Sequence, residues 1–183
     1  MIIVWILLGI VAVGLIWLIA VYNGLISLKN RTQEAWSDID VQLKRRYDLI
    51  PNLIETVKGY AKHEKDVFTD VTKARTEAMQ AKGLVDKAQK ENMLSETLKS
   101  MFAVAESYPD LKANQNFLHL QEQLTDTEDK IEASRRFYNG NVRDFNTKIQ
   151  VFPNNMVAKQ LGFKEFDLFE TASGEREAVK VKF

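Results

Sequence analysis

The two histidines, His63 and His119, are the side chains best suited to bind a metal or transfer a proton near neutral pH. Glu64 follows His63, as in a zinc-protease helix, but the position four residues after His63 is Val67 and not the second histidine that such a site needs. Di-iron bundles need Glu-x-x-His pairs, and neither histidine has a glutamate three residues before it. Because cysteine is also absent, the sequence predicts no catalytic residue, metal or cofactor, and a structural or surface role for both histidines.

Other signatures of enzymes and of nucleic-acid-binding proteins are missing as well. The eight glycines are scattered and form no phosphate-binding loop. The 25 basic and 25 acidic residues give zero net charge, so no general attraction to nucleic acid is expected. Lys44, Arg45 and Arg46 form a short basic run, for which a solvated face is favoured over contact with lipid headgroups. The sequence therefore predicts a protein that is not an enzyme.

Three polar residues, Gln121, Glu128 and Arg135, recur every seven positions on a stripe that is otherwise apolar. Steps of four and three residues are typical of a helix that packs one face against partner helices. A charge buried there is costly unless it is paired. The three residues either fix the register of the helices or line a polar groove for a ligand, and register-setting is favoured because no catalytic set is complete. The stripe is Phe117, Gln121, Leu124, Glu128, Ile131, Arg135, Tyr138, Val142, Phe145, Ile149 and Phe152.

A long helix over residues 114–152 must position this stripe. It contains no proline and would be about 58 Å long. Such a helix cannot bury its stripe alone, so the chain must supply partner helices. Tyr138, on the same stripe, is a further candidate for an interaction inside the bundle.

A second stripe precedes it in the chain. Trp36 falls on this stripe, which favours a core anchor over a binding residue. Arg46 and Glu64 also take stripe positions, so we expect some of Arg46, Glu64, Glu128 and Arg135 to form charge-compensated contacts inside the bundle. The stripe is Leu25, Leu28, Thr32, Trp36, Ile39, Leu43, Arg46, Ile50, Leu53, Val57 and Tyr60, and the same spacing continues through Glu64, Val67, Val71, Ala74 and Ala78.

Several residues indicate where helices bend or end. Pro51 predicts either a kink in one long helix or a break, with Asp48 capping a second helix. Residues 81–91 have little periodicity and predict a turn or frayed connection, followed by a short amphipathic helix over residues 94–105. Pro109, within Ser107-Tyr108-Pro109-Asp110, stops that helix, and Ser107 or Asp110 could cap the next one.

The segment Ile2–Tyr22 carries no charged residue. As a helix it spans about 31 Å, which matches a hydrocarbon core of roughly 30 Å. A signal peptide is the competing interpretation, but no basic residue precedes the run, the run is too long and no cleavage site follows. An uncleaved single-pass anchor is predicted. Lys29 and Arg31 follow it, so the positive-inside rule predicts a cytoplasmic bundle.

The C-terminal part predicts a short helical turn over residues 156–161, closed by Gly162. The expected domains are a transmembrane anchor over residues 1–24, a helical bundle over 25–162, and an aromatic tail over 163–183 that packs on the bundle or extends from it. The residues behind the tail prediction are Phe163, Phe166 and Phe169, followed by Val179, Val181 and Phe183, whose alternation with lysines indicates a short extended end.

Short blocks along nearly the whole chain carry a resemblance to a known family. They are Tyr22-Asn23, Leu28-Lys29-Asn30, Glu34 through Arg46, Asp48 through Leu53, Tyr108 through Asn114, Leu120-Gln121 through Thr127-Glu128, Arg135-Arg136, Tyr138-Asn139, Phe152-Pro153 and Gly162-Phe163. In this order they resemble the LemA family of bacterial membrane proteins. The resemblance implies an N-terminal anchor and a helical bundle, with no established enzyme activity and no agreed catalytic residue. A related branch is associated with building magnetosome membranes, which suggests a role in membrane organisation.

These patterns predict an all-α protein of the bacterial inner membrane. A single N-terminal transmembrane helix, held in the lipid bilayer through residues 2–22, continues into an elongated antiparallel bundle of long, heptad-patterned helices resembling a coiled coil. The predicted function is a non-enzymatic scaffold that self-associates and organises the membrane or a membrane-bound partner. The alternative is an accessory or regulatory subunit of a membrane enzyme complex, such as a quality-control protease.

A homo-oligomer is expected for three reasons, the first being that polar stripe residues at heptad spacing are a device for choosing one assembly over others. Trp36, Tyr47 and Phe137 are large side chains that a single three-helix bundle would not bury fully, and exposed aromatic patches mark interfaces. Ala20 and Gly24 form one small-xxx-small pair at the inner end of the anchor, where helices could approach closely.

Overall fold

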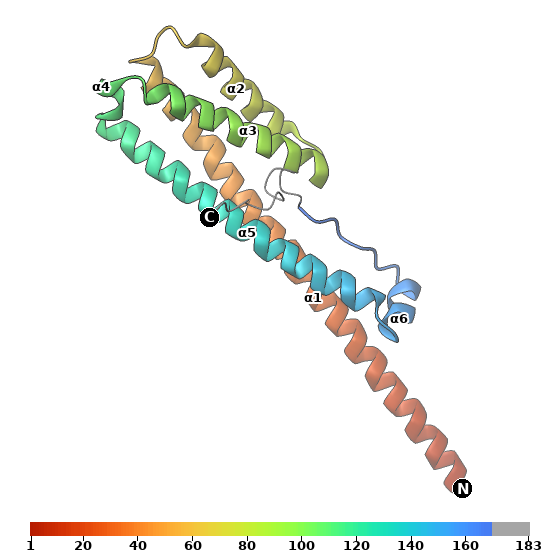
Figure 1. Ribbon diagram of the computed structural model, residues 1–183. Helices are drawn as coiled ribbons and strands as arrows, with labels where there is room; N and C mark the ends of the chain where they lie inside the picture. The colour runs from red at the N-terminus through yellow and green to blue at the C-terminus, as the bar shows by residue number, and fades with distance from the viewer. Residues whose placement is uncertain (170–183) are drawn as a thin grey trace, which may run out of the picture. The chain divides into compact units, whose positions relative to one another are not determined.

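The computed structural model describes residues 1–169, and within this part the chain is all-α, as predicted. The alternating residues Val179, Val181 and Phe183 lie outside the described residues. Residues 1–169 divide into two compact units, to which the two long helices both contribute. Unit 1 contains Met1–Asp38 and Ser134–Leu168, and unit 2 contains Ile39–Ala133 and Phe169. The helices are α1 (Ile2–Lys58), α2 (Lys65–Gln80), α3 (Leu84–Ala105), α4 (Pro109–Lys112), α5 (Gln115–Gln150) and α6 (Asn154–Gln160) (Figure 1).

Helix α1 runs without a break for 57 residues. Pro51 lies inside it, so of the two alternatives that Pro51 left open, a kink or a break, the break is excluded. The helix ends instead at Lys58, before Gly59, which has a low helix propensity. The apolar spacing continues past this end, but on the separate helix α2. The implied continuous helix through residues 64–78 is therefore wrong.

In the part of the chain described, α1 is the one helix long and apolar enough to cross a membrane. Residues 2–20 are all exposed, and none of the apolar span is buried inside the fold. No helix boundary separates the predicted anchor at residues 1–24 from the segment that follows, because α1 is continuous from Ile2 to Lys58. The first residues of α1 in the hydrophobic core of unit 1 are Val21 and Leu25.

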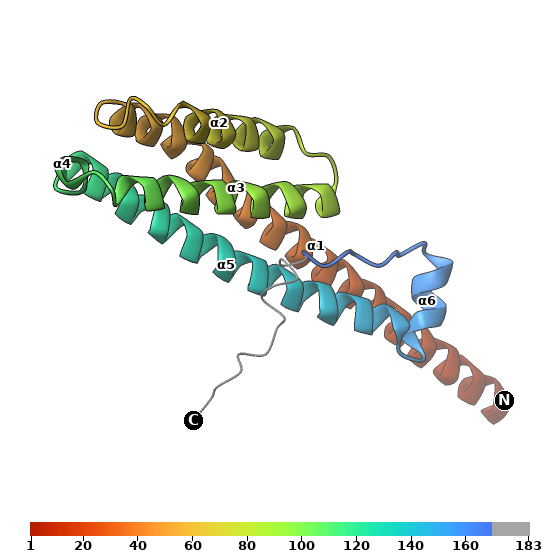
Figure 2. The same ribbon diagram turned by 45° about the horizontal axis from the view of Figure 1, so that its top comes forward.

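Unit 2 is built from the end of α1, α2, α3, α4 and the start of α5, with α2 and α3 side by side (Figure 2). The sequence predicted a three-helix bundle, and the additional helix is α2, which is separate from α1. The short helix predicted over residues 94–105 is longer than expected, since α3 begins at Leu84. The loop is short because Gly83 adopts a positive φ of 80° and Asp86 accepts a hydrogen bond from the Lys82 N–H at 3.0 Å. Fully buried residues of this unit include Leu43, Ile50, Leu53, Val71, Leu94, Met101 and Leu111.

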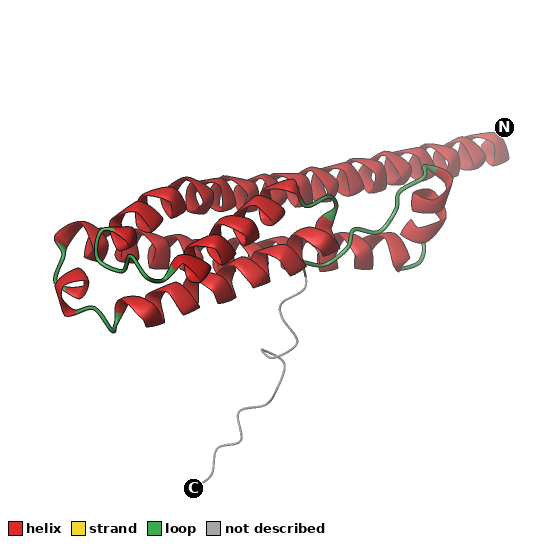
Figure 3. Cartoon of the chain, turned by 90° about the horizontal axis from the view of Figure 1, so that it is seen from above, coloured by secondary structure: helices red, strands yellow, loops and turns green. Residues whose placement is uncertain are grey.

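Unit 1 packs the first part of α1 against the second part of α5 and against α6. The two long helices are antiparallel here, since Trp36 contacts Tyr138 whereas Leu25 shares a hydrophobic cluster with Phe145 and Ile149. Viewed from above, α6 lies beside α1 near the end of α5 (Figure 3). The cluster consists of Val21, Leu25, Phe145, Ile149, Val157 and Ala158, with Leu28, Phe163 and Phe166 packed against it.

Helix α5 follows the predicted stripe closely. It begins one residue after Asn114, whose side-chain oxygen accepts a hydrogen bond from the Phe117 N–H at 3.1 Å. Eight of the eleven stripe residues are buried, and Gln121 and Glu128 are half-buried. The exception is Phe152, which is 78% exposed because α5 ends at Gln150 and the chain turns toward α6. The predicted burial of Phe152 is therefore wrong.

Candidate functional site

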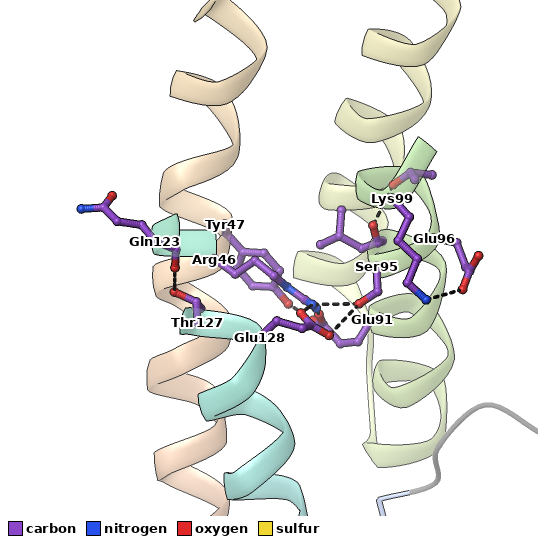
Figure 4. A network of polar contacts seen from close by, with 11 residues as sticks. Arg46, Tyr47, Glu91, Ser95, Glu96, Lys99, Gln123, Thr127 and Glu128 are labelled. Carbon is purple, nitrogen blue, oxygen red and sulfur yellow. Dashed lines mark hydrogen bonds and ion pairs between the residues drawn. The ribbon is translucent and has the colours of Figure 1, made fainter. Parts of the chain in front are cut away.

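The candidate site is a network of polar side chains around Arg46 in unit 2 (Figure 4). Arg46 lies on α1 between two buried apolar stripe residues, so its position on the helix turns it into the bundle. Its Nη2 pairs with the Glu91 carboxylate of α3. Its Nη1 donates to Glu128 Oε2 of α5 at 2.5 Å and to Ser95 Oγ of α3 at 3.0 Å. One guanidinium thus joins three helices.

Tyr47 extends the network to the fourth long helix. Its hydroxyl donates a hydrogen bond to Glu91, so both oxygens of that carboxylate have a buried partner. Its backbone carbonyl accepts a hydrogen bond from Arg75 Nε of α2 at 2.8 Å. Neighbouring positions 46 and 47 of α1 therefore bind side chains from α2, α3 and α5 in unit 2.

Burial makes this arrangement sensitive to charge. Arg46 and Glu91 are both 0% exposed, whereas the Glu128 side chain is 45% exposed. An ion held in such a place needs an opposite charge and hydrogen bonds to offset the loss of water. Glu91 supplies the buried counter-charge and Glu128 closes the network toward solvent. A cavity of about 200 Å³ adjoins the Glu128 side and is lined in part by Arg46, Lys99 and Phe102.

The predicted charge compensation is confirmed for Arg46 and Glu128. Glu64 makes a different contact and accepts a hydrogen bond from the Tyr108 hydroxyl at 3.0 Å. Arg135 is 8% exposed and belongs to unit 1. Gln121 is half-buried and borders a shallow pocket on α5.

Trp36 and Tyr138 meet in unit 1. Their ring centroids are 5.6 Å apart in an edge-to-face arrangement, and Tyr138 donates a hydrogen bond to the Asp167 carbonyl at 3.0 Å. Burial raises the pKa of Tyr138. The pair therefore ties α1 and α5 to the segment after α6, which is a packing role.

Glu91 is the residue that sequence reasoning missed. It was assigned to a frayed connection because of the mixed charges around it. A signal was present, since Glu91, Leu94, Leu98, Met101 and Ala105 follow one another at steps of three and four residues, and all five are buried. A carboxylate on that stripe is the expected counter-charge for a buried arginine.

The contacts of the network hold helices together. Its members form a buried ion pair with hydrogen bonds and include no histidine, while His63 and His119 are exposed. No cluster of three or more metal-binding side chains occurs within residues 1–169. Arg46 contacts carboxylates on both α3 and α5, the kind of buried polar contact by which helices set their register.

The pH dependence of stability should reveal the buried hydrogen bond of the Tyr47 hydroxyl. Burial, followed by the Glu91 carboxylate, raises the pKa of this hydroxyl well above its ordinary value near 10. The unfolded chain then loses this proton first, so the contribution of Tyr47 is complete below about pH 10 and is lost as pH rises further. We expect the stability difference between the native chain and Tyr47→Phe to shrink in alkaline urea titrations. A difference that stays constant from neutral to strongly alkaline pH would contradict the buried hydrogen bond.

Comparison with known proteins shows which family the chain belongs to. The family model described as the LemA family matches residues 35–183, which is most of the chain. The chain belongs to the LemA family. Among relatives of this LemA-family chain, Protein LemA of Metamycoplasma hominis is 29% identical over 177 residues, with 94% of this chain and 80% of the relative covered.

Two other relatives carry a more specific name. Magnetosome protein MamQ 2 of Paramagnetospirillum magneticum is 25% identical over 175 residues, and Magnetosome protein MamQ of Magnetospirillum gryphiswaldense is 23% identical over 174 residues. In both matches 81% of this LemA-family chain is covered, but the chain spans 64% of the relative's length. The likeness therefore leaves more than a third of each magnetosome protein unmatched.

Proposed function

We propose that this LemA-family chain is a non-enzymatic, membrane-anchored helical scaffold that self-associates and organises the membrane or a membrane-bound partner. The observation that carries the proposal is the continuity of α1. Residues 2–20 are apolar and exposed, and the same unbroken helix supplies core residues to both units. An exposed apolar helix of this length requires a hydrocarbon environment. A bundle built on it is held at the membrane without a flexible linker.

The polar groups inside the bundle support a structural role. Arg46, Glu91 and Glu128 are engaged with one another and with Ser95 and Tyr47, so the buried charge is used to hold helices together. Relatives that are magnetosome proteins, with the resemblance noted above, support a role in membrane organisation.

Self-association rests on exposed apolar groups. Phe137 on α5 is 60% exposed, as expected for a residue that one chain does not bury. Gly24 has nothing within 4 Å of a Cβ placed on it, so the face that it shares with Ala20 is open to another helix. Tyr47 does not support an interface: it is 6% exposed, so the expectation that the bundle leaves it uncovered is wrong.

Co-purification from mild detergent tests the scaffold. Two copies of the full chain with different affinity tags would be co-expressed, and one tag used for capture. The scaffold predicts recovery of the second tag in a stoichiometric amount without a foreign protein. Mixing separately expressed copies after lysis is the control for association in detergent. A stoichiometric foreign subunit with no second tag would contradict self-association and favour the accessory subunit of a membrane enzyme.

We further propose that the C-terminal bundle lies in the cytoplasm. Lys29 and Arg31 follow the span within about ten residues, and basic residues next to a span favour the cytoplasmic side. Protease added to intact spheroplasts should leave the bundle whole, and the same protease should digest it after the cells are lysed. Digestion of the bundle in intact spheroplasts would show that it lies on the outer side of the membrane.

A further inference from the structure

The turn between α5 and α6 exposes an apolar surface in unit 1. Val151, Phe152, Met156 and Leu161 are between 44% and 78% exposed, and we name these four residues the apolar tip. A group of large apolar side chains exposed at one turn is unusual on a surface that faces water. Such a group marks a contact with another protein or with a membrane. The proposed function, based on α1 and the interior of the bundle, makes no use of them.

The position of the apolar tip within unit 1 indicates which surface it contacts. Ile149, just before the tip, and Val157, within α6, share a hydrophobic cluster with Val21 and Leu25 of α1. The candidate span ends at Tyr22, so the tip lies beside the last turn of the span. In Figures 1 and 3, α6 is placed alongside α1 at the end of α5 nearer the N-terminus. A span that fills the hydrocarbon core brings this level to the bilayer interface.

Charge around the apolar tip fits an anionic membrane surface. Residues 143–165 contain four basic residues, Arg143, Lys148, Lys159 and Lys164, against two acidic ones, Asp144 and Glu165, and Glu165 accepts a hydrogen bond from Gln150 Nε2 at 2.8 Å. Lysines that flank exposed apolar and aromatic groups are the combination by which surface segments bind headgroups and insert into the acyl boundary. A protein partner would require neither the position beside the end of the span nor this excess of basic residues.

We infer that the apolar tip inserts into the interface of the same bilayer that α1 crosses, with the lysines at the anionic headgroups. The inference rests on the membrane anchor of the proposed function. Because α1 and α5–α6 share one hydrophobic cluster, a second membrane contact fixes the tilt and rotation of α1 in the bilayer. Unit 1 is then presented in one orientation, as an organising surface requires.

Single-cysteine labelling of the full chain tests the inference, and the absence of native cysteine makes the labelling specific. An environment-sensitive fluorophore is placed at Phe152→Cys in vesicles of phosphatidylethanolamine and phosphatidylglycerol, with nitroxide lipids as quenchers. Phe137→Cys is the matched control, since Phe137 is 60% exposed in unit 1 and lies about four helical turns before Phe152 in the chain. A contact between copies at Phe137, as the proposed function allows, would shift the emission there but would give no quenching by lipid. Trp17→Cys within the candidate span reports on the anchor itself.

Each outcome bears on a defined claim. The inference predicts blue-shifted emission and strong quenching by a shallow nitroxide at position 152, strong quenching at position 17, and little quenching at position 137. Quenching at position 17 with equal, weak signals at 152 and 137 would overturn the inference and leave the anchor standing. A blue shift at 152 without lipid quenching would assign the tip to a second protein copy and would also overturn it. Loss of quenching at position 17 would overturn the anchor, and the tip with it.

Discussion

Glu91→Ala is expected to lower the free energy of unfolding by about 3–5 kcal/mol, because it leaves a buried guanidinium without its buried counter-charge. Arg46 and Glu91 are both 0% exposed and bonded to each other. The variant also removes the acceptor of the Tyr47 hydroxyl. Urea unfolding of the full chain in detergent, followed by circular dichroism, measures the loss.

Two other glutamates make the comparison quantitative. Glu128→Ala removes a half-exposed partner of the same arginine and should cost about 1.5–3 kcal/mol, the range for hydrogen bonds to charged groups. Glu96→Ala, on the same helix as Glu91, breaks only a surface pair with Lys99 and should have an effect of about 1 kcal/mol or less. Equal losses for Glu91 and Glu96 would show that the network does not hold the helices.

Phe145→Ala should destabilise unit 1 by about 3–5 kcal/mol, the cost of deleting a buried aromatic ring and leaving a cavity. Phe145 is 1% exposed. Its ring centroid lies 6.2 Å from that of Phe163 and 5.1 Å from that of Phe166. The substitution therefore loosens both the α1–α5 contact and the segment after α6.

The control for this cavity is Leu118→Ala, on the same helix. Leu118 is 45% exposed, and surface substitutions of this kind usually change stability by about 0.5 kcal/mol or less. Hydrogen exchange resolved by segment would show increased exchange in residues 145–168 for Phe145→Ala alone. Unchanged exchange there would mean that these rings are not a packed cluster in solution.

Side-chain periodicity predicted which faces are buried more reliably than where the backbone stops. The stripe through α5 and the stripe through α1 both lie in the cores, and the Arg46–Glu128 contact follows from them. The same spacing crosses from Lys58 to Lys65 without change, although α1 ends and α2 begins between them. Spacing reports which face packs, whereas a helix end depends on local residues such as Gly59.

Only part of the polar network could be predicted from the sequence. Arg46 and Glu128 stood out because each interrupts an apolar stripe on a long helix. Glu91 did not, because Lys82, Asp86, Lys87 and Lys90 surround it and dilute the periodicity of the start of α3. The register of α3 against α1, which brings Glu91 to Arg46, depends on a three-residue loop whose conformation is determined by Gly83.

For the apolar tip, the sequence pattern predicted burial where the structure shows exposure. Phe152 continues the stripe at the right spacing, and periodicity alone assigns it to the core. It is exposed because α5 ends two residues earlier, and an aromatic residue beyond a helix end no longer shares the buried face. The bilayer, as a second apolar solvent, is what makes such exposure physically consistent.

If the chain is a membrane-anchored, self-associating scaffold, the intact assembly in lipid nanodiscs contains more than one copy, and its mass measures the number. The full chain is used, since the anchor supplies the Ala20–Gly24 face. Mass photometry, with empty discs subtracted and a monomeric single-span protein as reference, gives the copy number. We expect a protein mass that is an integer multiple, greater than one, of the 21.0 kDa chain at micromolar concentration. A single 21.0 kDa chain per disc, whatever the ratio of protein to lipid, would contradict it.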